Sequence, residues 1–509
     1  MTTGALLAWE DVLCEETISP GWKDTCQVRK IRGRQRERRR VRIGAPDASV
    51  TGYAGVAVLS EMLDRLGVVA DLDTAIGPIK SRDRGATAGQ LLVSLAQAQL
   101  CGHDYLVGLD RVRADTAAGA LSAVPIPAST TAASLARRLS VEQWLAVEDG
   151  LATTARRVLG LLPTRRRGVL ERTAATIDLD TTDTETYGRT KQGVSFNHTG
   201  QRVGRTHLAT WAQAGIPLAA DLRHGTSDPR TYSPELMERA LAGLARIGVY
   251  RPDDPTAPRP VFRMDTGYMS GALAWTAVEA ESDFAIGVRR GTAVWAALAR
   301  VRADAWRPAV GMAGAEVAVA DYAPGGWPPG TACVVRRVRL DAATISADPR
   351  ARRRRTIDPD QLALALDGEL DTVYAYSFIA TNLPVDTPAR AVAVEAWYRQ
   401  RTDIEDRFRD AKHGAALRHL PSADPDVNLA WVWGALLATT LSAWLQELGG
   451  LDDGAGRGRA HLGRLRRDLI NIPARIVRRG RELIIRPASA HHSILAAVLA
   501  RLRALPATA

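Results

Sequence analysis

The stretch "RTAATIDLDTTDTETYG", residues 172–188, marks the point where the sequence changes from a helical to a β-rich pattern. Apolar residues and carboxylates alternate in it, and threonines, which favour strands, follow. Strand alternation puts Asp178 and Asp180 on the same face, so spacing alone does not choose between them. We favour Asp180 for a site, because it begins the polar turn closer to the strand end, where open α/β sheets place ligands.

Strands and helices alternate downstream of this stretch. Residues 206–225, "THLATWAQAGIPLAADLRHG", predict two strands joined by a Gly-Ile-Pro turn, and residues 233–248 predict a helix. The segment "PVFRMDTGY", residues 260–268, predicts a strand that ends at Asp265, and residues 283–291 predict another. The sequence therefore predicts an α/β fold.

The alternation is lost between residues 293 and 370, where Gly- and Pro-punctuated strands surround the basic cluster "RARRRR". This part is predicted to be a β-rich insertion. The strand "VYAYSFIATN", residues 373–382, then resumes the earlier pattern. After it, Thr387 as N-cap and Pro388 in the first turn predict one helix that continues to Lys412.

The region upstream, residues 49–168, has a helical pattern. Thr87 and Gln90 have the spacing of a capping box at the start of one helix. Residues 125–140, "PIPASTTAASLARRLS", predict a short capped helix that presents Arg137 and Arg138. Such a helix fits the second half of a helix-turn-helix that reads DNA, but short capped helices with two arginines are common, which favours an ordinary surface helix.

The chain of 509 residues carries a net charge of +11, with 67 Lys and Arg against 56 Asp and Glu. This balance favours a polyanionic partner such as nucleic acid. Residues 29–42, "RKIRGRQRERRRVR", are too charged to pack, and they indicate either a solvated arm or a phosphate-binding arm.

The cysteines, Cys14, Cys26, Cys101 and Cys333, show no paired spacing typical of a zinc site or a disulfide framework. The sequence also lacks the pattern of a secretion signal at its start, so we expect a cytoplasmic, nucleoid-associated protein. Residues 427–446 have the length and apolarity of a membrane span, but interspersed Asn, Thr and Ser favour a buried core helix and no membrane partner.

The stretch "YRQRTDIEDRFRDAK", residues 398–412, combines many charges with apolar residues at helical spacing. On one continuous helix, Tyr398, Arg401, Glu405 and Lys412 project within an arc of about 60°. An adjacent apolar face on which the helix can pack consists of Trp397, Ile404, Phe408 and Ala411. Glu405 is therefore expected at the edge of a buried face.

Three carboxylates thus stand at the ends of core elements, namely Asp180 or Asp178, Asp265 and Glu405. Hard oxygen ligands of this kind select Mg²⁺ or Mn²⁺, and two such ions can promote an in-line phosphoryl displacement. Each residue also has an ordinary explanation: Asp265 before Thr-Gly suits a turn, and Glu405 suits a surface pair with Arg401. Their joint occurrence favours a metal site.

Four of these residues carry a resemblance to a known family. Tyr398, Arg401, Glu405 and Lys412 match the Tyr-x-x-Arg-x-x-x-Glu-x-x-x-x-x-x-Lys pattern, and "DLDTT" and "DTGY" precede them in the expected order. The chain resembles bacterial insertion-sequence transposases of the DDE class, with looser similarity over about residues 50–490. The resemblance implies an RNase H-like mixed sheet flanked by helices, interrupted by a β-rich insertion and preceded by a helical DNA-binding region.

By this resemblance, the protein would cut the phosphodiester at each transposon end and join the freed 3′-OH to target DNA. Asp180, Asp265 and Glu405 would hold two Mg²⁺ ions, for which Mn²⁺ can substitute. Tyr398, Arg401 and Lys412 would contact phosphates near the scissile bond. The expected partners are double-stranded DNA, as terminal inverted repeats and target, and a second copy of the chain in a DNA-bound homodimer.

Two alternatives to an active transposase remain open from the sequence: a catalytically silent DNA-binding protein and a stand-alone nuclease. The expected domains are a basic arm (1–48), a helical DNA-binding domain (49–168), a catalytic domain in two parts (169–292 and 371–450), the β-rich insertion (293–370) and a C-terminal region (451–509).

Overall fold

The computed structural model describes residues 42–82, 84–254, 256–351, 353–452 and 458–506. The chain divides into residues 1–47 and a compact unit of residues 48–509, and the account below concerns this second unit. Cys14, Cys26 and most of the predicted basic arm lie outside the described residues.

Helices make up the first part of the unit, as the sequence predicts. They are α1 (Val56–Leu66), α2 (Val68–Ile76), α3 (Ala88–Leu100), α4 (Gly108–Ala114), α5 (Thr116–Leu121), α6 (Ser129–Ala136), α7 (Val141–Leu161) and α8 (Thr164–Arg172). The predicted capping box is confirmed, because Thr87 and Gln90 exchange side-chain and backbone hydrogen bonds at the start of α3. The predicted Ser/Thr cap of α6 is wrong: Ala128 precedes it without a side-chain cap.

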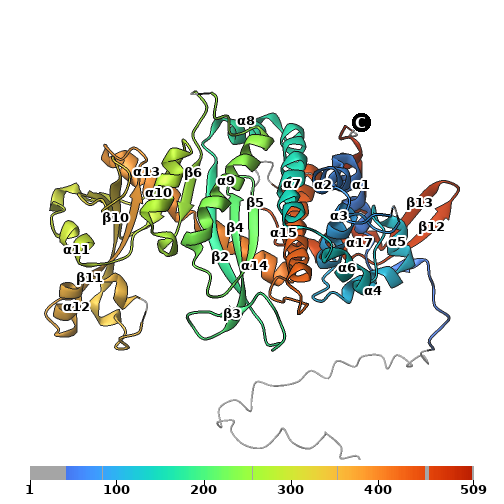
Figure 1. Cartoon of the computed structure of the whole chain (residues 1–509), viewed down its shortest axis with the longest axis horizontal. Helices are drawn as coiled ribbons and strands as arrows, with labels where there is room; N and C mark the ends of the chain where they lie inside the picture. The colour runs from blue at the N-terminus through green and yellow to red at the C-terminus, as the bar shows by residue number, and fades with distance from the viewer. Residues whose placement is uncertain (1–41, 83, 255, 352, 453–457, 507–509) are drawn as a thin grey trace, which may run out of the picture. The chain divides into compact units, whose positions relative to one another are not determined.

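A large mixed sheet follows the helices (Figure 1). Its strands are β2 (Thr176–Glu185), β3 (Ser195–Phe196), β4 (Arg202–Trp211), β5 (Ile216–His224), β6 (Val261–Met264), β7 (Asp283–Gly287), β8 (Arg307–Pro308), β9 (Ala315–Ala320), β10 (Ala332–Asp341) and β11 (Thr372–Thr381). The order is β3-β4-β2-β6-β7-β11-β10-β9-β8, and β5 pairs with β4. The pairs β2–β6 and β6–β7 are parallel, whereas the other pairs are antiparallel. The predicted α/β class with a mixed sheet is confirmed.

The segment predicted as an insertion contributes strands to this same sheet. β10 pairs with β11 along ten positions, and β9 pairs with β10 on the other side. The helices between and after the sheet strands are α9 (Pro229–Ile247), α10 (Gly271–Glu279), α11 (Thr292–Ala299), α12 (Pro359–Leu366), α13 (Pro388–Arg399) and α14 (Thr402–Gly414). The boundaries expected for the domains stay predictions.

The prediction of one helix from Thr387 to Lys412 is wrong in one respect. Thr387 does cap α13 through its side chain, and Pro388 is its first residue. However, α13 ends at Arg399 and α14 begins at Thr402, because the intervening turn is closed by bonds to the third residue back, such as Arg401 N–H to Tyr398 C=O.

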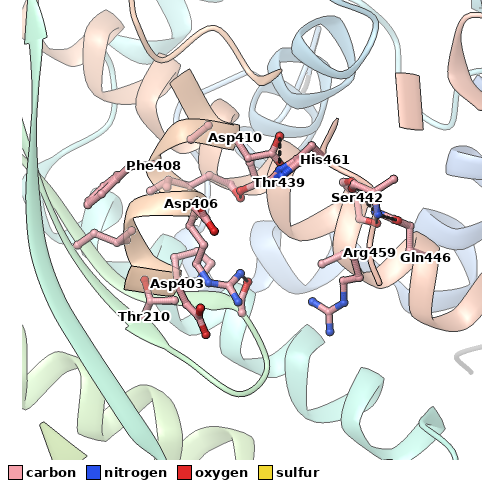
Figure 2. A pocket seen from close by; sticks show the side chains of 18 residues that line it. Thr210, Asp403, Asp406, Phe408, Asp410, Thr439, Ser442, Gln446, Arg459 and His461 are labelled. Atoms are coloured by element: carbon pink, nitrogen blue, oxygen red, sulfur yellow. Dashed lines mark hydrogen bonds and ion pairs between the residues drawn. The ribbon is translucent and has the colours of Figure 1, made fainter. Parts of the chain in front are cut away.

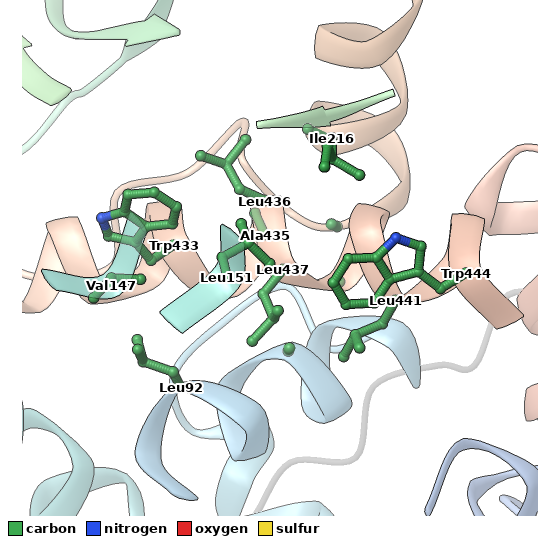
Figure 3. Close-up of a cluster of buried hydrophobic side chains, with 14 of the residues drawn as sticks. Leu92, Val147, Leu151, Ile216, Trp433, Ala435, Leu436, Leu437, Leu441 and Trp444 are labelled. Atoms are coloured by element: carbon green, nitrogen blue, oxygen red, sulfur yellow. The ribbon is translucent and has the colours of Figure 1, made fainter. Parts of the chain in front are cut away.

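The longest helix, α15 (Pro425–Gly449), lies in the core and packs against α3. Figure 3 shows Leu436, Leu437 and Leu441 of this helix among side chains from other elements. Among the described residues, it is the one helix that is long and apolar enough to cross a membrane. Of its most apolar stretch of 18 residues, 89% is buried inside the protein. This burial agrees with the prediction of a core helix.

The C-terminal part returns to the start of the unit. It contains α16 (Leu462–Leu465), a short π-helix (Arg466–Ile470), β12 (Ala474–Arg479), β13 (Glu482–Pro487) and α17 (Ser489–Arg503). β12 and β13 form a hairpin, and β1 (Val50–Thr51) pairs with β12 to complete a three-stranded sheet. The helix α17 packs against α1 and α15, so the C-terminal part belongs to the helical region of the fold.

Candidate active site

The two aspartates of β2 have different surroundings. Asp178 is 1% exposed and both its oxygens accept bonds from Arg263 of β6, from Nε at 2.6 Å and from Nη2 at 2.8 Å. Asp180, two residues further along β2, accepts a bond from the guanidinium of Arg401 at 3.2 Å instead. Asp178 is thus committed to an internal ion pair, and Asp180 faces the residues predicted to form the site.

Asp265 comes directly after β6, the parallel neighbour of β2. Its Oδ1 accepts the backbone N–H of Gly267 at 2.8 Å and so caps the 3₁₀ turn Thr266–Tyr268. The ordinary turn role considered for this residue is therefore present in the structure. The hydrogen bond engages one of the two carboxylate oxygens.

Arg401 joins the strand carboxylate to the helix carboxylate. Its Nη1 lies 3.2 Å from Oδ2 of Asp180, and its Nη2 lies 3.3 Å from Oε1 of Glu405. The Arg401 side chain is 16% exposed, whereas that of Glu405 is 54% exposed. The ion pair between Arg401 and Glu405 is thus present, but the Arg401 guanidinium also contacts Asp180 of the sheet strand β2.

The carboxylates influence one another electrostatically. The pKa of Asp180 is raised to about 6, mainly by burial; Arg401 opposes this rise, and the negative charges of Asp265 and Glu405 add to it. The geometry behind this is that Arg401 contacts both Asp180 and Glu405, and that Asp265 follows β6, the strand parallel to β2.

Tyr398 supports the strand that leads to Asp265. Its hydroxyl donates to the carbonyl oxygen of Met264 at 2.7 Å, and burial raises the pKa of the phenol. Gly287 at the end of β7 leaves room for it, since a Cβ there would lie 2.9 Å from the Tyr398 hydroxyl oxygen and 2.9 Å from the Thr266 nitrogen. In this structure the hydroxyl serves the protein rather than a phosphate.

Lys412 also contacts the sheet. Its Nζ donates to the backbone carbonyl of Asp183 in β2 at 2.8 Å, and burial lowers its pKa. The Asp183 carboxylate is held by Arg205, with Nε to Oδ1 at 2.7 Å, and by Asn197. Lys412 thus links the second half of α14 to β2 at Asp183, three residues after Asp180.

Asp180, Asp265 and Glu405 carry carboxylate oxygens, the type of ligand that hard divalent cations prefer. Within the described residues, no group of three or more His, Cys, Asp or Glu side chains is close enough to hold a metal ion. In this structure the Arg401 guanidinium contacts both Asp180 and Glu405. Carboxylate ligands of this kind are chemically suited to Mg²⁺ or Mn²⁺.

Sequence reasoning missed Arg263 and Tyr268, which flank Asp265. Arg263 fixes Asp178 across the parallel pair β2–β6, a pairing that the residue spacing does not reveal. Tyr268 is 1% exposed, its hydroxyl has no hydrogen-bond partner among the described residues, and Asp180 and Asp265 help raise its pKa. Nothing in the residue spacing distinguishes it from a core tyrosine.

A cavity lies on the other side of α14. It has a volume of about 240 Å³, and Figure 2 shows Asp403, Asp406 and Asp410 of α14 facing Gln446 and Arg459 there. Arg407 also lines it and donates to the carbonyl oxygen of Gly215 at 2.7 Å, which links α14 to the end of β4 and the start of β5. Because Asp180, Asp265 and Glu405 do not line it, the cavity is separate from the candidate active site.

Comparison with known proteins agrees with the residue pattern. The family model described as "Transposase DDE domain group 1" matches residues 34–507. A cryo-EM structure of the piggyBac transposase synaptic complex with hairpin DNA is similar at 10% identity and a TM-score of 0.34, over 90% of this chain and 83% of that chain. No curated protein matches.

Since the family model spans nearly the whole chain, the protein belongs to the DDE transposase family. The resemblance inferred from Tyr398, Arg401, Glu405 and Lys412 is thereby confirmed at the level of the family. This is a family of DNA-cleaving and strand-transferring enzymes that generally use divalent metal ions.

Proposed function

We propose that the protein is an active transposase of a bacterial insertion sequence, of the branch with the Tyr-Arg-Glu-Lys pattern. It would cut the phosphodiester at each end of the element and join the freed 3′-OH to target DNA. The observation that carries the proposal is the convergence of Asp180 and Glu405 on Arg401, with Asp265 as electrostatic neighbour, in a member of the DDE family.

In this proposal, Asp180, Asp265 and Glu405 hold the divalent ions, two Mg²⁺ or Mn²⁺. When bound, such ions activate the attacking oxygen and stabilise the leaving oxygen. Arg401 then exchanges its carboxylate partners for a phosphate oxygen of the DNA, since its donors suit both. Asp178 keeps its bond to Arg263 and takes no part in metal binding.

The other residues of the pattern have supporting positions. We propose that Lys412, anchored to β2, presents its charge to the DNA strand near Glu405, where it offsets the repulsion between phosphate and carboxylates. Tyr398 holds the end of β6 through its hydrogen bond to the Met264 carbonyl oxygen. It would also contact a phosphate near the scissile bond. Both roles follow from the family resemblance and from the contacts of Tyr398 with β6 and of Lys412 with β2.

We further propose that the catalytic fold is RNase H-like, with residues 293–370 as the β-rich insertion. The mixed sheet supports this, because antiparallel β2, β4 and β5 are followed by the parallel strands β6 and β7. The proposed partners are double-stranded DNA, as terminal inverted repeats and target, and a second copy of the chain in the DNA complex. Such a protein would work in the cytoplasm at the nucleoid.

The test is nicking of a duplex that carries the element's own terminal repeats, with Mg²⁺ added to the wild-type protein, to Glu405→Gln and to Asp406→Asn. Asp406 is the matched control, because it is the adjacent acidic residue of α14 and lines the cavity on the other side. Glu405→Gln is expected to lower cleavage by at least about 100-fold, the scale on which removing one electrostatic catalytic group acts, while DNA binding persists. Asp406→Asn is expected to cleave like the wild type.

Cleavage retained by Glu405→Gln would refute the assignment of the site. Binding of the repeats by the wild type without any cleavage or joining would instead favour a silent DNA-binding protein. Cleavage without joined products would favour a nuclease.

A further inference from the structure

The small sheet formed by β1, β12 and β13 has one face on the core and one face in solvent. Ile476 and Ile485 are cross-strand partners, and both pack against the main core. Alternation along the strands turns the neighbouring pair, Arg475 and Arg486, to the opposite face. Both of these arginines are exposed, so the outer face begins with two like charges in register.

The hairpin is strongly basic. Residues 474–487, "ARIVRRGRELIIRP", hold five arginines and a single carboxylate, Glu482. Gly480, with φ of 60°, and Arg481 form the turn, which Arg478 and Arg479 precede directly. All the arginines of the hairpin are exposed, and in the described part of the chain Arg478, Arg479, Arg481 and Arg486 make no ion pair.

Like charges placed opposite each other, as Arg475 and Arg486 are, weaken an antiparallel pair. Some equally exposed arginines elsewhere in the protein do have a carboxylate close by, for example Arg302 with Asp304 at 2.7 Å. Arg478, Arg479, Arg481 and Arg486 therefore remain available to the anions of a partner.

We propose that the β1–β12–β13 sheet, with the arginine tip of its hairpin, is a docking surface for the phosphate backbone of duplex DNA. This inference rests on the proposed function, since it names a surface through which a transposase holds its substrate. A two-stranded ribbon of six residues per strand is about 20 Å long and fits the major groove of B-DNA. Exposed arginines along its outer face and at its tip would then reach phosphates on either side.

The order of the chain adds a second argument. β1 lies next to β12, and the arginine-rich sequence of residues 29–42 precedes β1 in the chain. A duplex held by the hairpin is therefore within covalent reach of a second basic segment. Two linked weak sites bind one polymer more tightly than either does alone.

A groove of about 680 Å³ lies beneath the hairpin. It is lined by Glu61 and Asp64 of α1 and also by Arg481 and Arg503. This mixed charge attracts phosphate less than the outer face does, where Arg475 lies opposite Arg486. The outer face and the tip are thus the parts of the hairpin that are proposed to touch the duplex.

The test compares the triple variant Arg478→Gln, Arg479→Gln, Arg481→Gln with a control triple variant, Arg251→Gln, Arg302→Gln, Arg390→Gln. The control removes the same charge from arginines that are 54%, 81% and 58% exposed and are paired with local carboxylates. Binding of a fluorescent duplex to the full-length proteins is followed by anisotropy at several salt concentrations, and thermal unfolding verifies that each variant folds.

The tip variant is expected to bind the duplex at least about 10-fold more weakly, and the slope of log K against log salt is expected to fall by about 2 to 3, one unit for each lost phosphate contact. The control should remain within about twofold of the wild type, because its arginines are proposed to touch no phosphate. Replacing the three tip arginines by lysine should restore most of the affinity, since lysine keeps the charge.

Equal weakening in the tip and control variants, or unchanged binding by the tip variant, would overturn the inference. It would also fall if the tip variant lost binding to anionic lipid vesicles, or lost self-association in sedimentation, while it bound DNA normally. These results leave the proposed function intact as long as Glu405→Gln stops cleavage. Absence of any duplex binding by the wild type would instead refute both proposals.

Discussion

At the scale of the residue, the chemistry of β2 depends on which partner each aspartate meets. Asp178 and Asp180 share a face by alternation, and sequence spacing leaves both as candidate ligands. The deciding feature is Arg263, which lies on the parallel strand β6 and takes both oxygens of Asp178. Pairing between distant strands is not encoded in local spacing, so this choice required the structure.

Asp178→Asn is expected to destabilise the protein by about 3 kcal/mol or more, because the substitution leaves the Arg263 guanidinium buried without its counter-charge. Asp180→Asn removes a carboxylate that burial already disfavours, so its free energy of unfolding should stay close to that of the wild type while cleavage is lost. Urea unfolding followed by circular dichroism measures both. Comparable stability of the two variants would contradict the division of roles.

At the scale of the element, the break between α13 and α14 shows where periodicity fails as a guide. Gln400 and Arg401 are good helix formers, and no Gly or Pro marks a boundary. The helices instead pack on different partners, α13 on β9 and β10 and α14 on α15. The predicted apolar face is largely confirmed, since Ile404, Phe408 and Ala411 are buried.

The end of β7 is predicted to be intolerant of a side chain. In Gly287→Ala, the added Cβ would meet the backbone nitrogen of Thr266 and the hydroxyl of Tyr398, each at 2.9 Å. Overpacking of this kind costs about 1–3 kcal/mol, and the shift of the turn after Asp265 should also lower cleavage. Gly325→Ala, with no atom within 4 Å of its added Cβ, is the control. Thermal unfolding and nicking rates for the two variants test the prediction, and equal behaviour would disprove it.

The contact between α7, β5 and α9 predicts a dependence of stability on pH. Glu148 of α7 accepts the Ala220 N–H at 3.1 Å and an Arg239 N–H at 2.9 Å, and burial raises its pKa from 4.5 to about 8. The folded protein therefore binds this proton more tightly than the unfolded chain does. The stabilising contribution of the protonated group is complete below pH 4.5 and is lost as the pH rises to about 8.

Glu148→Gln has no ionisable group at this position, so the pH-dependent loss of stability from Glu148 should be absent in this variant. Its free energy of unfolding relative to the wild type is expected to rise by on the order of 3 kcal/mol between pH 5 and pH 8, as measured by urea titrations at each pH. Asp149→Asn, whose carboxylate is 46% exposed, provides the control. A constant difference between Glu148→Gln and the wild type across this range would show that the carboxylate is ionised in the folded protein.

At the scale of the whole molecule, the sequence reveals the class of fold more readily than its connections. Alternation of strands and helices from Thr176 to Ile286 predicts the mixed α/β core, and the helical pattern of the preceding region is equally clear from the sequence. The pairing of β10 with β11, which extends the sheet with strands of the presumed insertion, was not predicted. Nor was the pairing of β1 with β12, which joins two ends of the chain. Both are long-range contacts that neither propensity nor period reports.

The candidate site shows the same limit. The residue types and their spacing indicated Asp180, Asp265 and Glu405; in the structure Arg401 contacts Asp180 and Glu405, and Asp265 follows the strand beside β2. What spacing could not indicate is that Arg401 lies between Asp180 and Glu405, because that contact links a helix start to a strand end.

The central claim is that these three carboxylates share a pair of divalent ions when DNA is bound. The most direct test is anomalous diffraction from crystals of the protein with a terminal-repeat duplex and Mn²⁺. We predict two anomalous peaks about 4 Å apart that contact Asp180, Asp265 and Glu405, with the Arg401 guanidinium turned to a phosphate. Peaks bound elsewhere, or a DNA complex in which Arg401 still bridges Asp180 and Glu405 without any metal, would contradict the claim.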